Sequence, residues 1–211
     1  MKCHCILITV FFCASAFRSA AQNNDSILID SLVKEIAAIQ VTGQGEYFPG
    51  MFPSFRECGG APHNYQPDNN IFFTAITSFG LKNLLPHLQG DSKSIIEETI
   101  KKAAAVYPFY KNKSGEPFYS FWPTGYPIMP HAFVFQYLKG VFGQGDDTDD
   151  TVMVLMTSDN SEKDIALLRQ RMQLVSNLSS PKRKIHSTYK EYRNLPAHST
   201  YLGTRMPPDF D

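Results

Sequence analysis

The chain has 211 residues, of which 43% are hydrophobic and 19% charged, and its twenty basic residues balance its twenty acidic ones. This composition excludes a disordered, collagen-like or fibrous protein and is typical of a globular domain. A near-neutral chain also lacks the excess positive charge that nucleic-acid binding requires, so no nucleic-acid partner is expected.

The N-terminal segment, residues 1–21, has the layout of a secretory signal peptide. A short basic start precedes an apolar run over residues 5–17, and small residues lead to a cleavage site after Ala21. The apolar run is too short for a permanent membrane anchor, which needs about 20 residues. We therefore expect no stable membrane anchor and a mature domain over residues 22–211, exported to the periplasm or secreted.

Cysteine and histidine usage argues against a disulfide and against a zinc site. Three of the four cysteines lie in the predicted signal peptide, so Cys58 has no partner within the mature chain. No Cys/His spacing suits a zinc site, and the lone thiol has no histidine at a diagnostic spacing. We expect a packed or loop thiol, no metal and no cofactor.

Hydrophobic periodicity predicts helices along most of the chain. Apolar residues recur at helical spacing over residues 25–40, 91–107 and 164–178, whereas residues 70–85 and 150–156 are apolar almost throughout. Long stretches rich in proline or glycine, residues 41–69 and 108–130, separate the helices. An apolar stretch also covers residues 131–138. No strand pattern of useful length is found, so the predicted fold class is all-α.

The order of these helices predicts an architecture. A buried helix followed by an amphipathic one occurs twice, over residues 70–85 and 91–107 and again over 150–158 and 161–178. This weak internal repeat indicates a partial α/α toroid built of helical hairpins. Such hairpins need neighbours to bury their inner helices, and the chain supplies about half a ring. Two explanations stay open: an incomplete chain, or a half-ring that completes itself as a homodimer.

Four carboxylates, at Asp146, Asp147, Asp149 and Asp150, lie within five residues at the predicted start of a helix. Like charges at such short range would raise at least one carboxyl pKa in a low-dielectric cavity, which makes a Brønsted acid. The alternative is that Asp149 or Asp150 merely caps the helix. The run does not fit an EF-hand, although an irregular Ca²⁺ site remains a further alternative.

The stretch from Asp147 to Met153 resembles the DxDD-T-x-M motif of class II terpenoid cyclases, in the terpenoid cyclase/protein prenyltransferase superfamily of α/α toroids. The resemblance covers about seven residues. It implies that Asp149 is a metal-free general acid that protonates an alkene or epoxide, with Asp147 and Asp150 as tuning partners.

A second candidate site is the aromatic loop between Tyr107 and Tyr126. Four of its side chains are candidate ligand-binding residues: Tyr119, Phe121, Trp122 and Tyr126. Aromatic faces of this kind stack on sugar rings, whereas the alternative is that they fasten the loop to the helices. Two functions are therefore carried forward. One is a binding module or inactive fragment for a glycan or apolar small molecule; the other is an enzyme that acts on a glycan or a terpenoid-like substrate with Asp149 as general acid.

Overall fold

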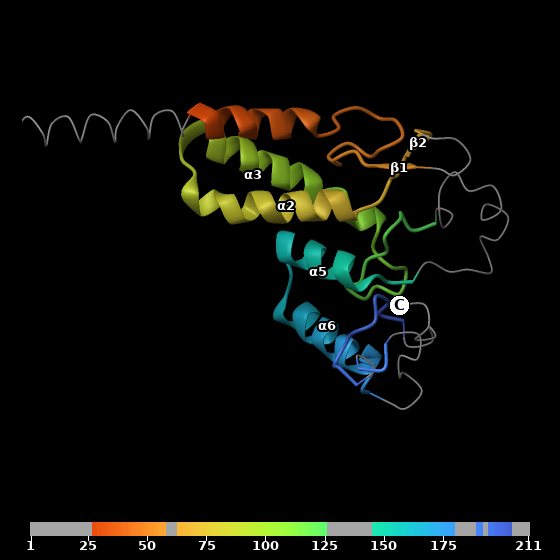
Figure 1. Ribbon diagram of the computed structural model, residues 1–211. Helices are drawn as coiled ribbons and strands as arrows, with labels where there is room; N and C mark the ends of the chain where they lie inside the picture. The colour runs from red at the N-terminus through yellow and green to blue at the C-terminus, as the bar shows by residue number, and fades with distance from the viewer. Residues whose placement is uncertain (1–26, 58–62, 126–144, 180–188, 192–193, 204–211) are drawn as a thin grey trace, which may run out of the picture.

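The computed structural model describes residues 27–57, 63–125, 145–179, 189–191 and 194–203 (Figure 1). The predicted signal peptide, Cys58, Tyr126 and the apolar stretch over residues 131–138 lie outside the described residues. Among the described residues, no helix is both long enough and apolar enough to cross a membrane.

The described elements are five helices, two short strands and two 3₁₀ turns. In chain order they are a helix over residues 27–39, β1 (Phe55–Glu57), β2 (Tyr65–Pro67), α2 (Phe72–Leu84), a 3₁₀ turn (Leu85–His87), α3 (Gly90–Ala104), a 3₁₀ turn (Tyr107–Phe109), α5 (Thr148–Thr157) and α6 (Glu162–Val175). Figure 1 shows the first helix, α3 and α2 stacked side by side, with α5 below α2 and α6 beyond α5.

The prediction of an all-α fold, and with it of a partial α/α toroid, is wrong, because the structure is mixed. β1 and β2 form an antiparallel pair in which Phe55 faces Pro67 and Glu57 faces Tyr65. Each strand has only three residues, which is too short for an alternating pattern to be recognised in the sequence. Proline is tolerated in such a strand because each strand of a two-stranded sheet has a free edge.

The four helices of the two predicted pairs are confirmed, as α2 and α3 and as α5 and α6. On α3, the lysine and glutamate side chains are exposed while Ile96 and Ala103 are buried. The helix α2 departs from its predicted burial, however. It buries two small polar residues, Thr74 and Ser78, and leaves Phe73 about half exposed.

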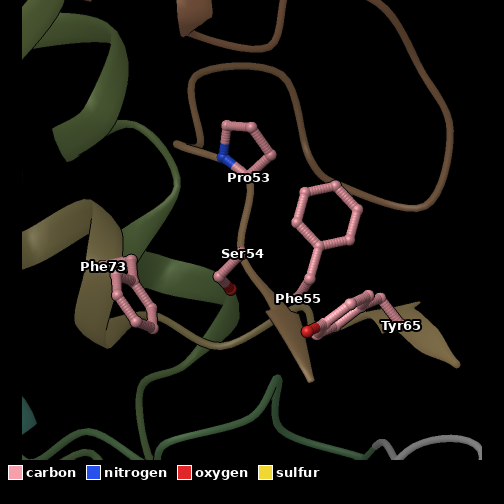
Figure 2. A pocket seen from close by; sticks show the side chains of 5 residues that line it. All are labelled: Pro53, Ser54, Phe55, Tyr65 and Phe73. Atoms are coloured by element: carbon pink, nitrogen blue, oxygen red, sulfur yellow. The ribbon is translucent and has the colours of Figure 1, made fainter. Parts of the chain in front are cut away.

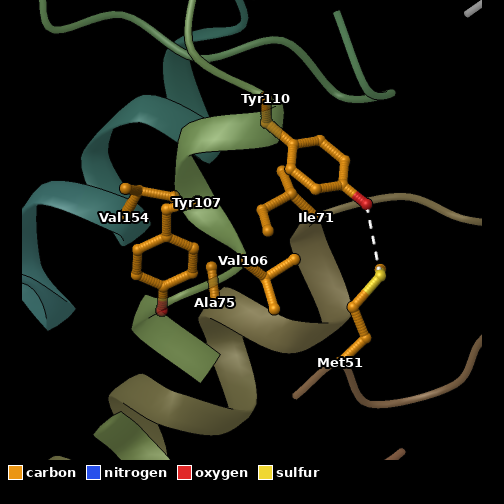
Figure 3. Packing of buried hydrophobic residues seen from close by; sticks show 7 residues of the cluster. All are labelled: Met51, Ile71, Ala75, Val106, Tyr107, Tyr110 and Val154. Carbon is orange, nitrogen blue, oxygen red and sulfur yellow. Dashed lines mark hydrogen bonds between the residues drawn. The ribbon is translucent and has the colours of Figure 1, made fainter. Parts of the chain in front are cut away.

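Three clusters of buried side chains hold these elements together. The first joins α2, α5 and the segments around residues 51 and 107 (Figure 3) and consists of Met51, Ile71, Ala75, Val106, Tyr107, Tyr110 and Val154. The second joins α5, α6 and residue 202, and consists of Phe118, Leu155, Leu168, Val175 and Leu202. The third joins the first helix to α2 and α3 through Val33, Phe52, Leu81 and Ile96. Through these clusters α2 contacts the first helix, α3 and α5. The cluster that includes α6 contains no residue of α2.

A glycine fixes the path of the segment that leads into β1. Gly50 has φ 101°, and a Cβ atom there would lie 2.3 Å from the carbonyl oxygen of Lys102 on α3. Its own carbonyl accepts a hydrogen bond from the side chain of Gln40, which also donates to the Thr99 carbonyl. The segment is thereby held against α3.

Candidate functional site

The acidic run lies where the chain enters α5, and backbone hydrogen bonds to two remote segments hold it there. The Asp147 N–H donates to the Tyr119 carbonyl (2.7 Å), and the Thr148 N–H donates to the Thr200 carbonyl (2.7 Å). Asp147 thus lies between residues 119 and 201 in a pair of isolated antiparallel bridges. Gly145 makes room for this arrangement, because a Cβ atom there would lie 2.7 Å from the ring of Tyr201.

The alternative in which Asp149 or Asp150 caps the helix is not observed. The N-cap residue is Asp147, and its side chain accepts no capping hydrogen bond. Asp149 and Asp150 lie in the first turn, where Asp149 is exposed and accepts a 3.2 Å bond from the N–H of Asp150. Helix capping therefore does not account for the three acids.

Two of the acids are buried and leave carboxylate oxygens unpaired. Asp150 is 0% exposed, and neither of its carboxylate oxygens has a hydrogen-bond partner. Asp147 is 7% exposed, and its Oδ1 is likewise unpaired. No ion pair among the described residues includes either side chain. An unpaired buried charge is costly, so a folded chain needs a means of neutralising these carboxylates.

The electrostatics of the cluster follow from this burial. Burial, followed by the nearby charge of Asp149, raises the pKa of Asp150 to about 8. Burial and the interactions with Asp149 and Asp150 raise the pKa of Asp147 to about 9. The prediction that at least one carboxyl of the run has a raised pKa is confirmed, and it applies to the two buried acids.

The neighbouring Asp146 lies at the edge of this cluster. Burial also raises its pKa, and a 3.0 Å hydrogen bond from the side-chain amide of Asn112 partly offsets that effect. Asp146 is therefore partnered, unlike Asp150.

One carboxylate oxygen from each of Asp147, Asp149 and Asp150 lies within 4.8 Å of the other two. Such a cluster can act in either of two ways: it can retain protons on its buried members, or it can surround a cation. Both are ways of neutralising buried carboxylates.

The predicted aromatic loop is used mainly for packing. The Trp122 indole N–H donates to Asp68 Oδ1 (2.8 Å), and the Arg56 guanidinium lies 5.6 Å from the centre of the indole ring. Phe121 packs edge-on against Trp122, with ring centroids 4.7 Å apart. Tyr119 is half-buried and lies beside the entrance to α5. These three side chains fit the alternative in which the aromatics fasten the loop, and Tyr126 lies outside the described residues.

Another group of aromatic side chains surrounds a hollow beside the two-stranded sheet (Figure 2). The hollow has a volume of about 580 Å³ and is lined by Pro53, Ser54, Phe55, Tyr65 and Phe73. The strand register places Phe55 and Tyr65 diagonally on one face of the sheet. Phe73 reaches the hollow from the first turn of α2.

The three rings of this hollow are open to solvent, at 62% for Phe55, 56% for Tyr65 and 48% for Phe73. Sequence reasoning missed Tyr65 and Phe73. The signal for Phe73 was the adjacent pair Phe72–Phe73, because consecutive helical residues point about 100° apart and cannot both lie at the centre of one buried face.

Comparisons with known proteins add no relative. No family model matches the chain, and no curated protein or solved structure matches it significantly. The argument for function therefore depends on the residues of this chain.

Proposed function

We propose that this chain is an exported binding protein that holds a carbohydrate in the hollow lined by Phe55, Tyr65 and Phe73. One observation supports the proposal most directly: three large aromatic rings from three elements, β1, β2 and α2, converge on one hollow and are each about half exposed or more. The export component of the proposal comes from the signal-peptide pattern of residues 1–21.

Exposed aromatic rings at a hollow favour a ligand with flat apolar faces. A sugar ring presents a patch of C–H groups on each face, and an aromatic ring can stack on that patch while displacing poorly held water. Clustered apolar exposure of this kind is typical of a binding surface, whereas singly scattered exposed residues need no explanation.

Polar groups beside the rings suit the edge of a sugar. No hydrogen bond between the hydroxyl of Tyr65 and another described residue is found, so this hydroxyl can bond a ligand. Glu57 faces Tyr65 across the sheet and is exposed. A phenol hydroxyl and a carboxylate can bond the hydroxyl groups that surround a sugar ring.

The two-stranded sheet that carries Phe55 and Tyr65 is held in place by contacts within the protein itself. On the opposite face of the sheet, Arg56 lies 3.6 Å from the buried carboxylate of Asp68, which also accepts the Trp122 bond. Ser54 donates a 2.5 Å hydrogen bond to the Asp68 carbonyl. A fixed backbone reduces the entropy lost on binding.

The test uses the full mature chain and a panel of soluble oligosaccharides, comprising β-1,4-linked glucose, β-1,3-linked glucose and β-1,4-linked mannose hexamers. Isothermal titration calorimetry should detect binding of at least one of them. Phe73→Ala and Tyr65→Ala should each weaken that binding about tenfold, which corresponds to about 1.4 kcal/mol.

Phe109→Ala serves as the matched control, because Phe109 is 51% exposed but stacks on Phe48 outside the hollow. It should bind the oligosaccharide as the wild type does. The proposal fails if no oligosaccharide binds the folded chain, or if removing Phe73 weakens binding no more than removing Phe109. Binding of an apolar dye alone, with the same dependence on Phe73, would point instead to an apolar ligand.

An enzyme with Asp149 as general acid, which the cyclase resemblance implies, is the less favoured proposal. The side chain of Asp149 is exposed, whereas a proton donor to an alkene works from a water-excluded position. None of the three acids lines the described hollow.

A further inference from the structure

We propose that Asp147, Asp149 and Asp150 form a binding site for one Ca²⁺ ion at the start of α5. This inference concerns a site separate from the aromatic hollow and does not depend on the carbohydrate proposal.

The spacing of the carboxylate oxygens suits calcium. One oxygen from each acid lies within 4.8 Å of the other two. Oxygens bound to Ca²⁺ at about 2.3–2.6 Å can be as far as about 5 Å from one another across the ion, whereas Mg²⁺, at about 2.1 Å, allows only about 4 Å. Three oxygens with this spacing can therefore contact one Ca²⁺ with little movement.

The unpaired state of Asp150 is the independent observation that points to a ligand. Asp150 is completely buried, belongs to the converging trio, and has no hydrogen-bond partner for either oxygen. Native structures pair nearly all buried polar atoms, and an unpaired one calls for a missing water, ion or proton. A divalent cation would satisfy Asp150 and the unpaired Oδ1 of Asp147 together.

The charge balance also favours a divalent ion. Three ionised carboxylates carry a charge of −3, and Ca²⁺ reduces it to −1. A residual negative charge is stabilised at the N-terminal end of a helix, where the macrodipole contributes about half a positive charge. The acids stand at that end of α5, with Asp147 as the N-cap residue.

Backbone bridges hold the segment around the trio, and one side of the trio is open to solvent. The bridges on either side fix the position of Asp147, and the helix α5 fixes that of Asp150, so two of the three ligands are held in place. Asp149 is exposed, so water can complete a coordination shell of six to eight oxygens from its side.

The experiment uses the full mature chain after treatment with a chelator that is then removed. CaCl₂ is titrated into it by calorimetry, and thermal unfolding is recorded with and without CaCl₂. We expect binding with a dissociation constant of about 10⁻⁵–10⁻³ M, between the weakest regulatory sites and extracellular modules, and a rise in the unfolding temperature. MgCl₂ should bind at least about tenfold more weakly because of the oxygen spacing.

Two variants test the ligands. Asp150→Asn should weaken Ca²⁺ binding at least about tenfold, and it is expected to fold because it removes an unpaired buried charge. Asp149→Asn alters an exposed side chain, so folding is not at risk, and it should also weaken binding. Asp159→Asn is the matched control: Asp159 is exposed just beyond the other end of α5, and its variant should bind as the wild type does.

Three results would overturn the proposal. One is a folded wild-type chain that shows no response to CaCl₂ up to about 10 mM, well above the expected range; the buried acids would then be neutralised by protons. Another is equal affinity of Asp150→Asn and wild type for Ca²⁺. The third is equal affinity of the wild type for Ca²⁺ and Mg²⁺, which would be contrary to the spacing argument.

Discussion

Asp68 and Asp150 are both buried carboxylates, yet their surroundings are opposite. Asp68 directly follows β2 and accepts hydrogen bonds from Trp122 (2.8 Å) and from the side chain of Asn70 (3.1 Å), with Arg56 at 3.6 Å. Asp150 lies at the start of α5 and has no such partner. The first carboxylate organises structure through its bonds. The charge of the second destabilises the folded state until a proton or a cation neutralises it.

The difference shows that burial alone does not define the role of an acid. A carboxylate surrounded by donors stabilises the segments that supply those donors, whereas an unpaired one favours binding of a proton or a cation. The region around Asp68 is therefore read as scaffold for a binding surface, and the region around Asp150 as a site in its own right.

The largest expected effect comes from breaking the scaffold. Asp68→Ala should lower the free energy of unfolding by about 3 kcal/mol, because it removes the acceptor of one buried and one part-buried hydrogen bond and the partner of Arg56. Urea denaturation measures the loss. Asp159→Ala, an exposed acid in the other half of the molecule, should change stability by less than about 0.5 kcal/mol. Similar losses in the two variants would show that the partners of Asp68 do not stabilise the fold.

Gly50→Ala, in the segment that leads into β1, should lower the free energy of unfolding by a smaller amount. The positive φ and the contact with Lys102 leave no room for a methyl group, so stability should fall by about 2 kcal/mol. Gly43→Ala in the same loop is the control, because nothing lies within 4 Å of its added Cβ. Equal urea midpoints for the two variants would contradict the tight packing of this segment against α3.

A further expected effect is a dependence of stability on pH at the unpaired acids. The pKa of Asp150 in the folded chain, about 8, lies above that of an unfolded aspartate, so the folded state binds more protons at intermediate pH. In chelator, this group should therefore contribute most stability below about pH 4 and lose that contribution as the pH rises through about 8. Asp150→Asn should reduce the fall in stability between about pH 5 and pH 9 by at least about 1 kcal/mol, measured by urea midpoints. An unchanged slope would show that Asp150 carries no raised pKa.

The helices could be predicted from the sequence because their signals are local. The spacing of Ile96 and Ala103 on α3 defines a buried stripe, and the exposed lysines define its opposite face. The strands could not be predicted, because three residues are too few to show an alternating pattern of apolar and polar side chains. The burial of α2 was also misjudged: Thr74 lies inside because its hydroxyl accepts a hydrogen bond from the N–H of Phe52, a tertiary contact that no local pattern reveals.

The candidate sites could be predicted only in part. The acidic run is continuous in sequence, so its position was evident. The sequence did not reveal that Asp149 is exposed while Asp147 and Asp150 are buried, because that difference depends on segments around residues 119 and 200. The aromatic hollow was missed for a similar reason: Phe73 belongs to an apolar helix and looked like a core residue until the fold left it exposed.

The hydrogen bonds that hold the start of α5 also determine when its site can exist. The Thr200 carbonyl and the N–H of Leu202 bond to Thr148 and Asp146 from segments far downstream in the chain. During synthesis, the acids therefore emerge well before the residues that enclose them. Before residues 200–202 are available to enclose it, the acidic run can remain hydrated and ionised, and the cost of burying its charge arises only when those bonds form.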